Sequence, residues 1–135
     1  MKRSKERILS LTRSYRLPAL HALSGPELSD SQAFSIFGPC SRLHGHDYRI
    51  EVTLSGTLDP ATGMLIRRDE FDQRVSTALI DRLRGENLNE HFTFTTGEAL
   101  AVEFCRILSG VFPSPVRLTR VRVHETAKNS FDCGP

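Results

Sequence analysis

The residues with the most evident chemistry lie together between positions 40 and 46. Cys40 is followed by three residues and then by His44 and His46, which Gly45 separates. Because alternate residues of an extended strand point to one face, both imidazoles can reach a single cation. A cysteine beside a bound cation is also a candidate base or nucleophile. The spacing therefore predicts a metal centre with a reactive thiol next to it.

A third candidate ligand, His21, ends the first predicted strand, which covers residues 8–21. Three histidines leave one coordination position open, which is typical of a catalytic zinc site rather than a structural one. The alternative for any one of these histidines is a surface position or a satisfied place in the core. The prediction of a metal centre therefore depends mainly on His44 and His46 acting together.

Apolar residues recur with a helical period in some segments and alternate in others, which indicates an α+β fold. The predicted strands cover residues 8–21, 46–58, 116–125 and 130–133, and residues 64–66 are predicted to return as a hairpin partner after a turn at 59–63. The predicted helices cover residues 29–37, 69–83 and 96–108. We expect one domain over residues 1–135, with the two longer helices packed on one face of an antiparallel sheet.

Three local signals refine these elements. Pro18 favours an edge position or a bulge in the first strand, because proline cannot donate to a neighbouring strand. The alternation slips between Leu118 and Val121, which predicts a β-bulge. Residues 95–98 match a capping box, in which Glu98 would close the start of the last helix.

The composition is that of an ordinary globular chain, with 39% hydrophobic and 25% charged residues. The net charge of +2 is too small to indicate a nucleic-acid partner. No segment reaches the roughly 18–20 apolar residues of a membrane span. The basic start lacks the apolar segment of a signal peptide, and an odd set of three cysteines fits a reducing compartment. We therefore expect a cytoplasmic protein with neither a nucleic-acid nor a membrane partner.

Several motifs occur here in the order in which a known family carries them. They are the Cys-x3-His-Gly-His motif of residues 40–46 and the segments 18–21, 58–64, 87–89, 95–98 and 121–126. Together they make the chain resemble the 6-pyruvoyltetrahydropterin synthase / 6-carboxytetrahydropterin synthase family. The cysteine spacing is similar to that of the queuosine branch, whereas residues 28–39 are similar to the longer loop of the tetrahydrobiopterin branch.

The resemblance implies a tunnelling fold (T-fold) whose subunits assemble through sheet edges, commonly as a homohexamer of two stacked trimers. It implies a lyase that acts on 7,8-dihydroneopterin triphosphate and releases triphosphate. Zn²⁺ would be held by three ligands, Cys40 would be the base, and Glu125 would anchor the pterin. Thr96 and Glu98 would contact the substrate, with helix capping as the alternative for Glu98. The implied zinc ligands are His21, His44 and His46.

One segment departs from the family pattern. Arg84 and Gly85 stand where the family carries an Asp-His pair that relays protons with the cysteine. Glycine cannot transfer a proton, and arginine stays protonated near pH 7. His91, in the following loop, is a candidate catalytic replacement, and a surface position is its alternative. Arg84 could instead lower the pKa of Cys40 or hold a phosphate.

Three interpretations of function follow from this departure. The first is a lyase that makes a 6-carboxy- or 6-pyruvoyl-tetrahydropterin. The second is a divergent relative with weakened or altered activity, such as cleavage of the pterin side chain. The third is a non-catalytic oligomer that binds zinc or pterin.

Overall fold

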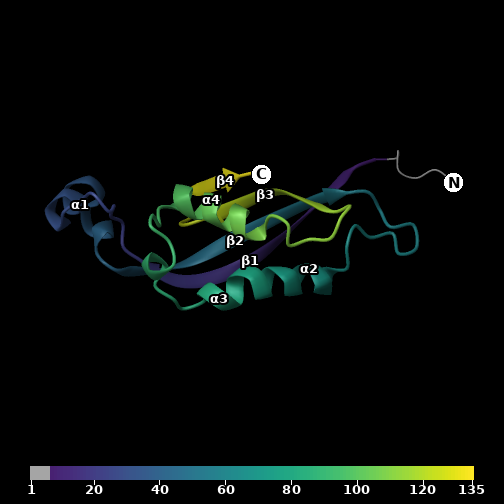
Figure 1. The fold of residues 1–135 in the computed structure, drawn as a ribbon, viewed down its shortest axis with the longest axis horizontal. Helices are drawn as coiled ribbons and strands as arrows, with labels where there is room; N and C mark the ends of the chain where they lie inside the picture. The colour runs from purple at the N-terminus through teal and green to yellow at the C-terminus, as the bar shows by residue number, and fades with distance from the viewer. Residues whose placement is uncertain (1–6) are drawn as a thin grey trace.

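One antiparallel sheet forms the centre of the protein. The computed structural model describes residues 7–135, so the basic residues 1–6 lie outside the described part of the chain. The strands follow each other in the order β1-β2-β3-β4, and β1 pairs with β2 over its whole length (Figure 1). Their bounds are Leu9–His21, His44–Gly56, Arg117–His124 and Ser130–Cys133. The predicted α+β class and the edge position of the first strand are confirmed.

Two helical segments cover the apolar face of this sheet. The first runs through α2 (Arg68–Val75), a π-helical turn η2 (Ser76–Ile80) and α3 (Asp81–Leu83), and the second is α4 (Gly97–Leu108). Alternate strand residues face the two segments and form one core with them. Core residues on the strands include Leu17, Tyr48, Ile50, Val52, Val121 and Val123, and those on the helices include Phe71, Val75, Leu79, Leu100 and Phe104.

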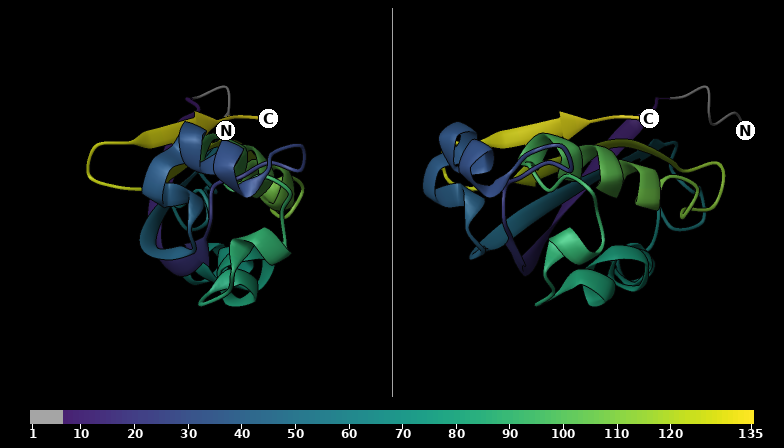
Figure 2. Two further views of the ribbon diagram at one scale, coloured as in Figure 1. Left: turned by 90° about the vertical axis from the view of Figure 1, so that its left-hand side faces the viewer. Right: turned by 60° about the vertical axis from the view of Figure 1, so that its left-hand side comes forward.

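The short helix α1 (Asp30–Phe37) stands at one end of the molecule, apart from the other helices (Figures 1 and 2). Ser29 caps it through a reciprocal pair of hydrogen bonds with Gln32, which satisfies free donors of the first turn. The 3₁₀ turn η1 (Gly38–Ser41) follows α1 and leads into β2. The predicted short helix is thus confirmed. In the described part of the chain, no helix has the length and hydropathy needed to cross a membrane.

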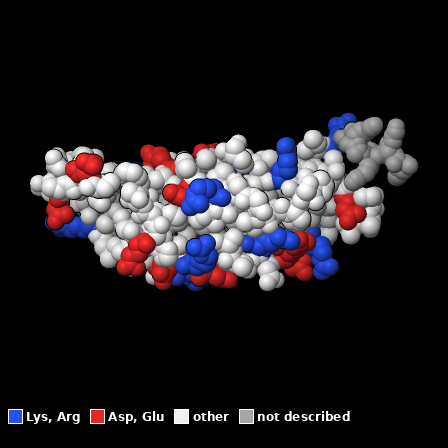
Figure 3. Space-filling model, in the orientation of Figure 1, with Lys and Arg blue, Asp and Glu red and all other residues white. Residues whose placement is uncertain are grey.

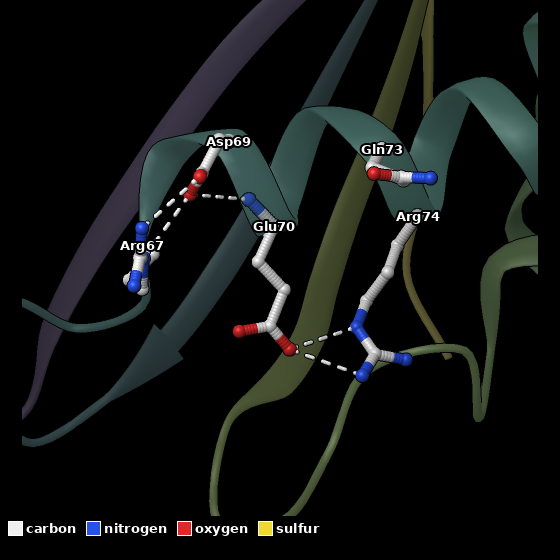
Figure 4. Close-up of a pocket in the computed structure, with 5 residues that line it drawn as sticks. All are labelled: Arg67, Asp69, Glu70, Gln73 and Arg74. Atoms are coloured by element: carbon white, nitrogen blue, oxygen red, sulfur yellow. Dashed lines mark hydrogen bonds and ion pairs between the residues drawn. The ribbon is translucent and has the colours of Figure 1, made fainter.

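Ion pairs fix the start of α2 and tie this helix to the sheet. Arg67 pairs with Asp69, and Glu70 pairs with Arg74 one turn later (Figure 4). Along the edge of the molecule that α2 and α3 form, basic and acidic side chains are intermixed (Figure 3). The next carboxylate, Asp72, points to β1 instead and accepts hydrogen bonds from Arg13 Nε and the Tyr15 hydroxyl, both at 2.7 Å.

Residues 64–66 do not form the predicted hairpin strand. The turn before them is present, because Asp59 O accepts a hydrogen bond from Gly63 N at 2.8 Å. However, both edges of β2 are already occupied, one by β1 and the other by β3. Leu65 and Ile66 are buried in the core instead, so they contribute apolar contacts rather than a strand.

The β-bulge is confirmed, and the predicted capping box of α4 is wrong. The register between β2 and β3 shifts after Thr53, so that Thr119 is the extra residue. Helix α4 begins one residue later than predicted: Thr96 is its N-cap and accepts a hydrogen bond from Ala99 N at 3.2 Å. Glu98 is exposed in the first turn. Its negative charge there complements the helix dipole.

Candidate metal centre

Three histidines from two paired strands converge at one end of the apolar face of the sheet. His21 ends β1 and lies directly opposite His44, the first residue of β2. His46 follows on the same face of β2, because side chains alternate along a strand. One ring nitrogen from each histidine can be chosen so that all three lie within 4.8 Å of one another. The structure thus brings together the predicted metal ligands.

Hydrogen bonds to backbone carbonyls orient two of the rings. His21 Nδ1 donates to Thr95 O at 2.8 Å, and His44 Nδ1 donates to Arg42 O at 2.7 Å. A proton on Nδ1 leaves the Nε2 lone pair free in a neutral imidazole, which is the form that binds a metal. A metal-binding histidine usually donates its other ring N–H to such a carbonyl, and His21 and His44 each do so.

The spacing of the nitrogens suits zinc. His44 Nε2 and His46 Nε2 lie 3.1 Å apart. Two nitrogens bound tetrahedrally at about 2.0–2.1 Å from one zinc ion stand about 3.3 Å apart. Three neutral nitrogen donors with one open position are also the donor set of catalytic zinc. The residues present therefore fit this ion.

Burial favours the neutral form of His21 and His46. The pKa of His21 is lowered to about 4, mainly by burial and also by the neighbouring His44 and His46, against the opposing hydrogen bond to Thr95. Burial likewise lowers the pKa of His46, although the charge of Glu125 acts in the opposite direction. Protons therefore compete weakly with a cation for these two rings at neutral pH.

Tyr48 and Thr95 are parts of the centre that sequence reasoning did not identify. The buried Tyr48 hydroxyl lies 3.1 and 3.2 Å from the two ring nitrogens of His21. Burial raises the pKa of Tyr48, so that it remains a neutral hydrogen-bonding group. The position of Tyr48 beside the histidines could have been predicted, because Tyr48 continues the alternating series of His44 and His46 along one face of the strand. Thr95 acts through its backbone carbonyl, which has no signature in the sequence.

Glu125 lies next to the three-histidine group. Cys40 is linked to the segment after His21 by a backbone hydrogen bond. Glu125 follows β3, and its Oε2 atom lies 3.9 Å from His21 Nε2. Cys40 lies on η1 with its side chain exposed, and its carbonyl oxygen accepts a hydrogen bond from Leu23 N at 2.8 Å. This bond holds η1 against the chain that leaves His21. The thiol itself is not a member of the three-histidine group.

His91 has a local partner outside the three-histidine group. Its Nε2 atom lies 3.2 Å from Glu86 Oε1. The ring also lines a cavity of about 200 Å³ with Arg82, Phe92 and Arg106, between α3 and α4. The structure therefore places His91 with Glu86 and the residues of this cavity, and not in the three-histidine group.

The segment that departs from the family pattern ends α3. Arg84 is exposed, and Gly85 has a φ of +74°, which few residues other than glycine adopt readily. Gly85 N also donates to Pro18 O at 2.7 Å, so this turn contacts β1 near the metal centre. The backbone geometry at this position is thus one that favours glycine.

Comparison with known proteins places the chain in a family. Residues 10–135 match the family described as 6-pyruvoyl tetrahydropterin synthase. A 6-pyruvoyl tetrahydrobiopterin synthase of Drosophila melanogaster is 35% identical, over 93% of this chain and 79% of the relative. A putative 6-carboxy-5,6,7,8-tetrahydropterin synthase of Archaeoglobus fulgidus is 33% identical, over 75% of this chain and 85% of the relative.

The fold agrees with this match. The solved structure of a Caenorhabditis elegans 6-pyruvoyl tetrahydropterin synthase superposes with a TM-score of 0.87 at 29% identity, covering 96% of both chains. The sheet, the two helical segments on its apolar face and almost the whole length of the sequence therefore correspond to one set of proteins. The chain belongs to the 6-pyruvoyl tetrahydropterin synthase family.

Proposed function

We propose that the protein is a zinc-dependent lyase that converts 7,8-dihydroneopterin triphosphate to a 6-carboxy- or 6-pyruvoyl-tetrahydropterin with loss of triphosphate. The observation that carries the proposal is the convergence of His21, His44 and His46, with two ring tautomers set by carbonyl groups. This cluster occurs in a chain of the tetrahydropterin synthase family, and the names of its relatives support a pyruvoyl- or carboxy-tetrahydropterin as the product.

The three histidines would hold the ion through their neutral nitrogens. Zinc bound there supplies Lewis acidity, which makes a C–H bond of the substrate side chain easier to deprotonate. Glu125 would orient the substrate, since a carboxylate can accept two hydrogen bonds from the guanidine-like edge of a pterin. Glu125 N donates to Asn129 O at 3.1 Å, and this bond fixes the backbone that carries the carboxylate.

Cys40 is the proposed base. As a thiolate, its Sγ atom would take a proton from the substrate side chain and return it to the neighbouring carbon. The start of α4 is proposed to contribute Thr96 and Glu98 to substrate binding. Support for this comes from Thr95, whose carbonyl lies 2.8 Å from His21 and therefore places the helix start beside the histidines.

A divergent activity is the second candidate, and the end of α3 favours it. Arg84 and Gly85 offer no group that exchanges protons readily near pH 7. His91 remains a proposed relay, and its Nε2 atom is paired with Glu86 rather than with a residue of the three-histidine group. A chain without an efficient relay would run the same chemistry slowly, or stop at cleavage of the side chain, or bind pterin and zinc without turnover.

Assembly and location complete the proposal. We propose a homohexamer built as a dimer of trimers, because β1 and β4 are the outer strands of the described sheet and paired edges remove an aggregation hazard. Cys40, Cys105 and Cys133 are all free thiols, which fits the reducing cytoplasm. The product would enter either queuosine or tetrahydrobiopterin synthesis.

A turnover assay tests the proposed reaction. The protein is incubated with 7,8-dihydroneopterin triphosphate, and inorganic triphosphate, acetaldehyde and product mass are measured. Wild type should release triphosphate, and Cys40→Ala should not. Cys133→Ala, which removes a thiol from β4, is the matched control and should retain the wild-type rate. Wild type that binds pterin but releases no triphosphate would refute the lyase and support the non-catalytic oligomer.

A further inference from the structure

We propose that Asn89 is a positioning residue of the metal centre, which aims His21 by holding the next residue of the chain, Ala22. The proposal rests on the zinc site of the proposed function and adds a residue whose role the family match does not supply. Asn89 lies in the 3₁₀ turn η3 (Leu88–Glu90), far from His21 in sequence.

The Asn89 carboxamide binds both backbone groups of Ala22. Ala22 N donates to Asn89 Oδ1 at 2.8 Å, and Asn89 Nδ2 donates to Ala22 O at 2.9 Å. A side chain here reproduces the two-bond rung of a β-ladder just beyond the end of β1. The Asn89 backbone is held in turn, because Asn89 N donates to Asn87 Oδ1 at 3.0 Å.

This rung is the last of a short series along the outer edge of β1. Gly85 N donates to Pro18 O at 2.7 Å, and Leu20 N donates to Glu86 O at 2.9 Å. The contacts thus fall on alternate residues of β1 and end at Ala22. His21 lies between two anchored neighbours, so its backbone is fixed on both sides while its side chain faces the other histidines.

The same network reaches the His21 ring. Thr95 O accepts the proton of His21 Nδ1, and the Thr95 hydroxyl lies 3.4 Å from both Asn89 Oδ1 and Ala22 O. Asn89 therefore contacts the residue that orients the ring as well as the backbone that carries it. Without its carboxamide, Ala22 N loses its hydrogen-bond partner and Ala22 O keeps only the 3.4 Å contact with the Thr95 hydroxyl, so the end of β1 is free to fray beside the fully buried His21.

Metal affinity measures this role directly. Outer groups that orient metal ligands typically change affinity by about 10- to 100-fold when they are removed. We expect Asn89→Ala to weaken zinc binding to the full-length apo-protein by that factor, as measured by competition with a chromophoric chelator. With Co²⁺ in place of zinc, the visible absorption spectrum of Asn89→Ala should differ from that of wild type, because the spectrum depends on the geometry of the metal ligands. Asn89→Asp should also weaken zinc binding and change the Co²⁺ spectrum. In this variant a carboxylate oxygen replaces Nδ2 opposite Ala22 O, and it has no proton to donate.

Gln32→Ala is the matched control. It removes a carboxamide that accepts a hydrogen bond from a backbone N–H, that of Ser29 at the start of α1, but it has no bond to Ala22, Thr95 or His21, so it should lose stability while its zinc affinity stays within about twofold of wild type. Wild-type zinc affinity and an unchanged Co²⁺ spectrum in folded Asn89→Ala would overturn the proposal, as would an equal loss of affinity in Gln32→Ala. Triphosphate release by the wild type decides the lyase separately, because zinc affinity is measured without substrate.

Discussion

The end of α3 gives the sharpest test of whether Arg84 and Gly85, in place of an Asp-His pair, limit the proposed turnover. The perturbation is the double substitution Arg84→Asp and Gly85→His, which restores the pair that the family pattern places there. Gly85 has a φ of +74°, and a Cβ added there meets no heavy atom within 4 Å. The substitution should therefore lower the free energy of unfolding by about 1–2 kcal/mol, through backbone strain rather than steric overlap. For a chain of this size, each kcal/mol lowers Tm by about 3–5 °C.

Gly110→His separates strain from chemistry. Gly110 has a φ of +81° and equally open surroundings, but it follows the opposite end of α4 from Thr95. That end lies about 18 Å along the helix axis from the end beside His21. We expect both variants to lose similar stability in thermal unfolding.

Only the double variant should gain activity. A positioned general acid or base contributes about 10²–10⁴-fold, so we expect triphosphate release to rise at least about tenfold above wild type. The assay is initial-rate triphosphate release with zinc-loaded protein, at a temperature where both variants are folded. A folded, zinc-loaded double variant with no gain over wild type would refute the reasoning that the missing pair limits turnover.

Two further predictions concern contacts between the helices and the sheet. Asp72→Asn should lower the free energy of unfolding by about 1–2 kcal/mol at pH 7, a value reduced for partial solvent exposure, because Asp72 accepts charge-assisted bonds from Arg13 and a bond from Tyr15. Arg13 holds the pKa of Asp72 below its usual value, so this contribution is present above about pH 4 and is lost as pH falls further. Denaturant unfolding of both proteins should therefore converge at low pH, and a constant difference would contradict the assignment. Gly97→Ala should cost about 1–3 kcal/mol, because an added Cβ overlaps the Phe131 ring. Phe131→Ala in the same chain should reduce that cost, and additive losses would argue against the overlap.

The three-histidine group could be predicted from the sequence because its geometry is local or follows from strand pairing. His44 and His46 are two residues apart on one strand, and antiparallel pairing places His21 opposite His44. The groups that orient the rings could not be found in this way. Thr95 O and Arg42 O are backbone carbonyls, which every residue possesses, so only the tertiary fold determines which carbonyl meets which ring.

The two wrong predictions, the capping box at 95–98 and the strand at 64–66, also depend on contacts that only the tertiary fold determines. Two adjacent threonines offered alternative caps for α4, and Thr96 takes that role while the Thr95 hydroxyl lies near Ala22 and Asn89. Local apolar pattern also could not show that both edges of β2 are occupied by other strands, which leaves residues 64–66 no place in the sheet. Long-range pairing, rather than local preference, decides such positions.

Metal content tests the central claim most directly. Wild type, purified without added metal or chelator, should carry about one zinc ion per chain, because the three histidines supply the donor set of a catalytic zinc site. Inductively coupled plasma mass spectrometry measures this metal content. His44→Ala should lose that zinc, whereas His124→Ala, which removes a histidine paired with Glu51, should keep it. Metal-free wild type that does not take up zinc, or full zinc occupancy in His44→Ala, would contradict the account.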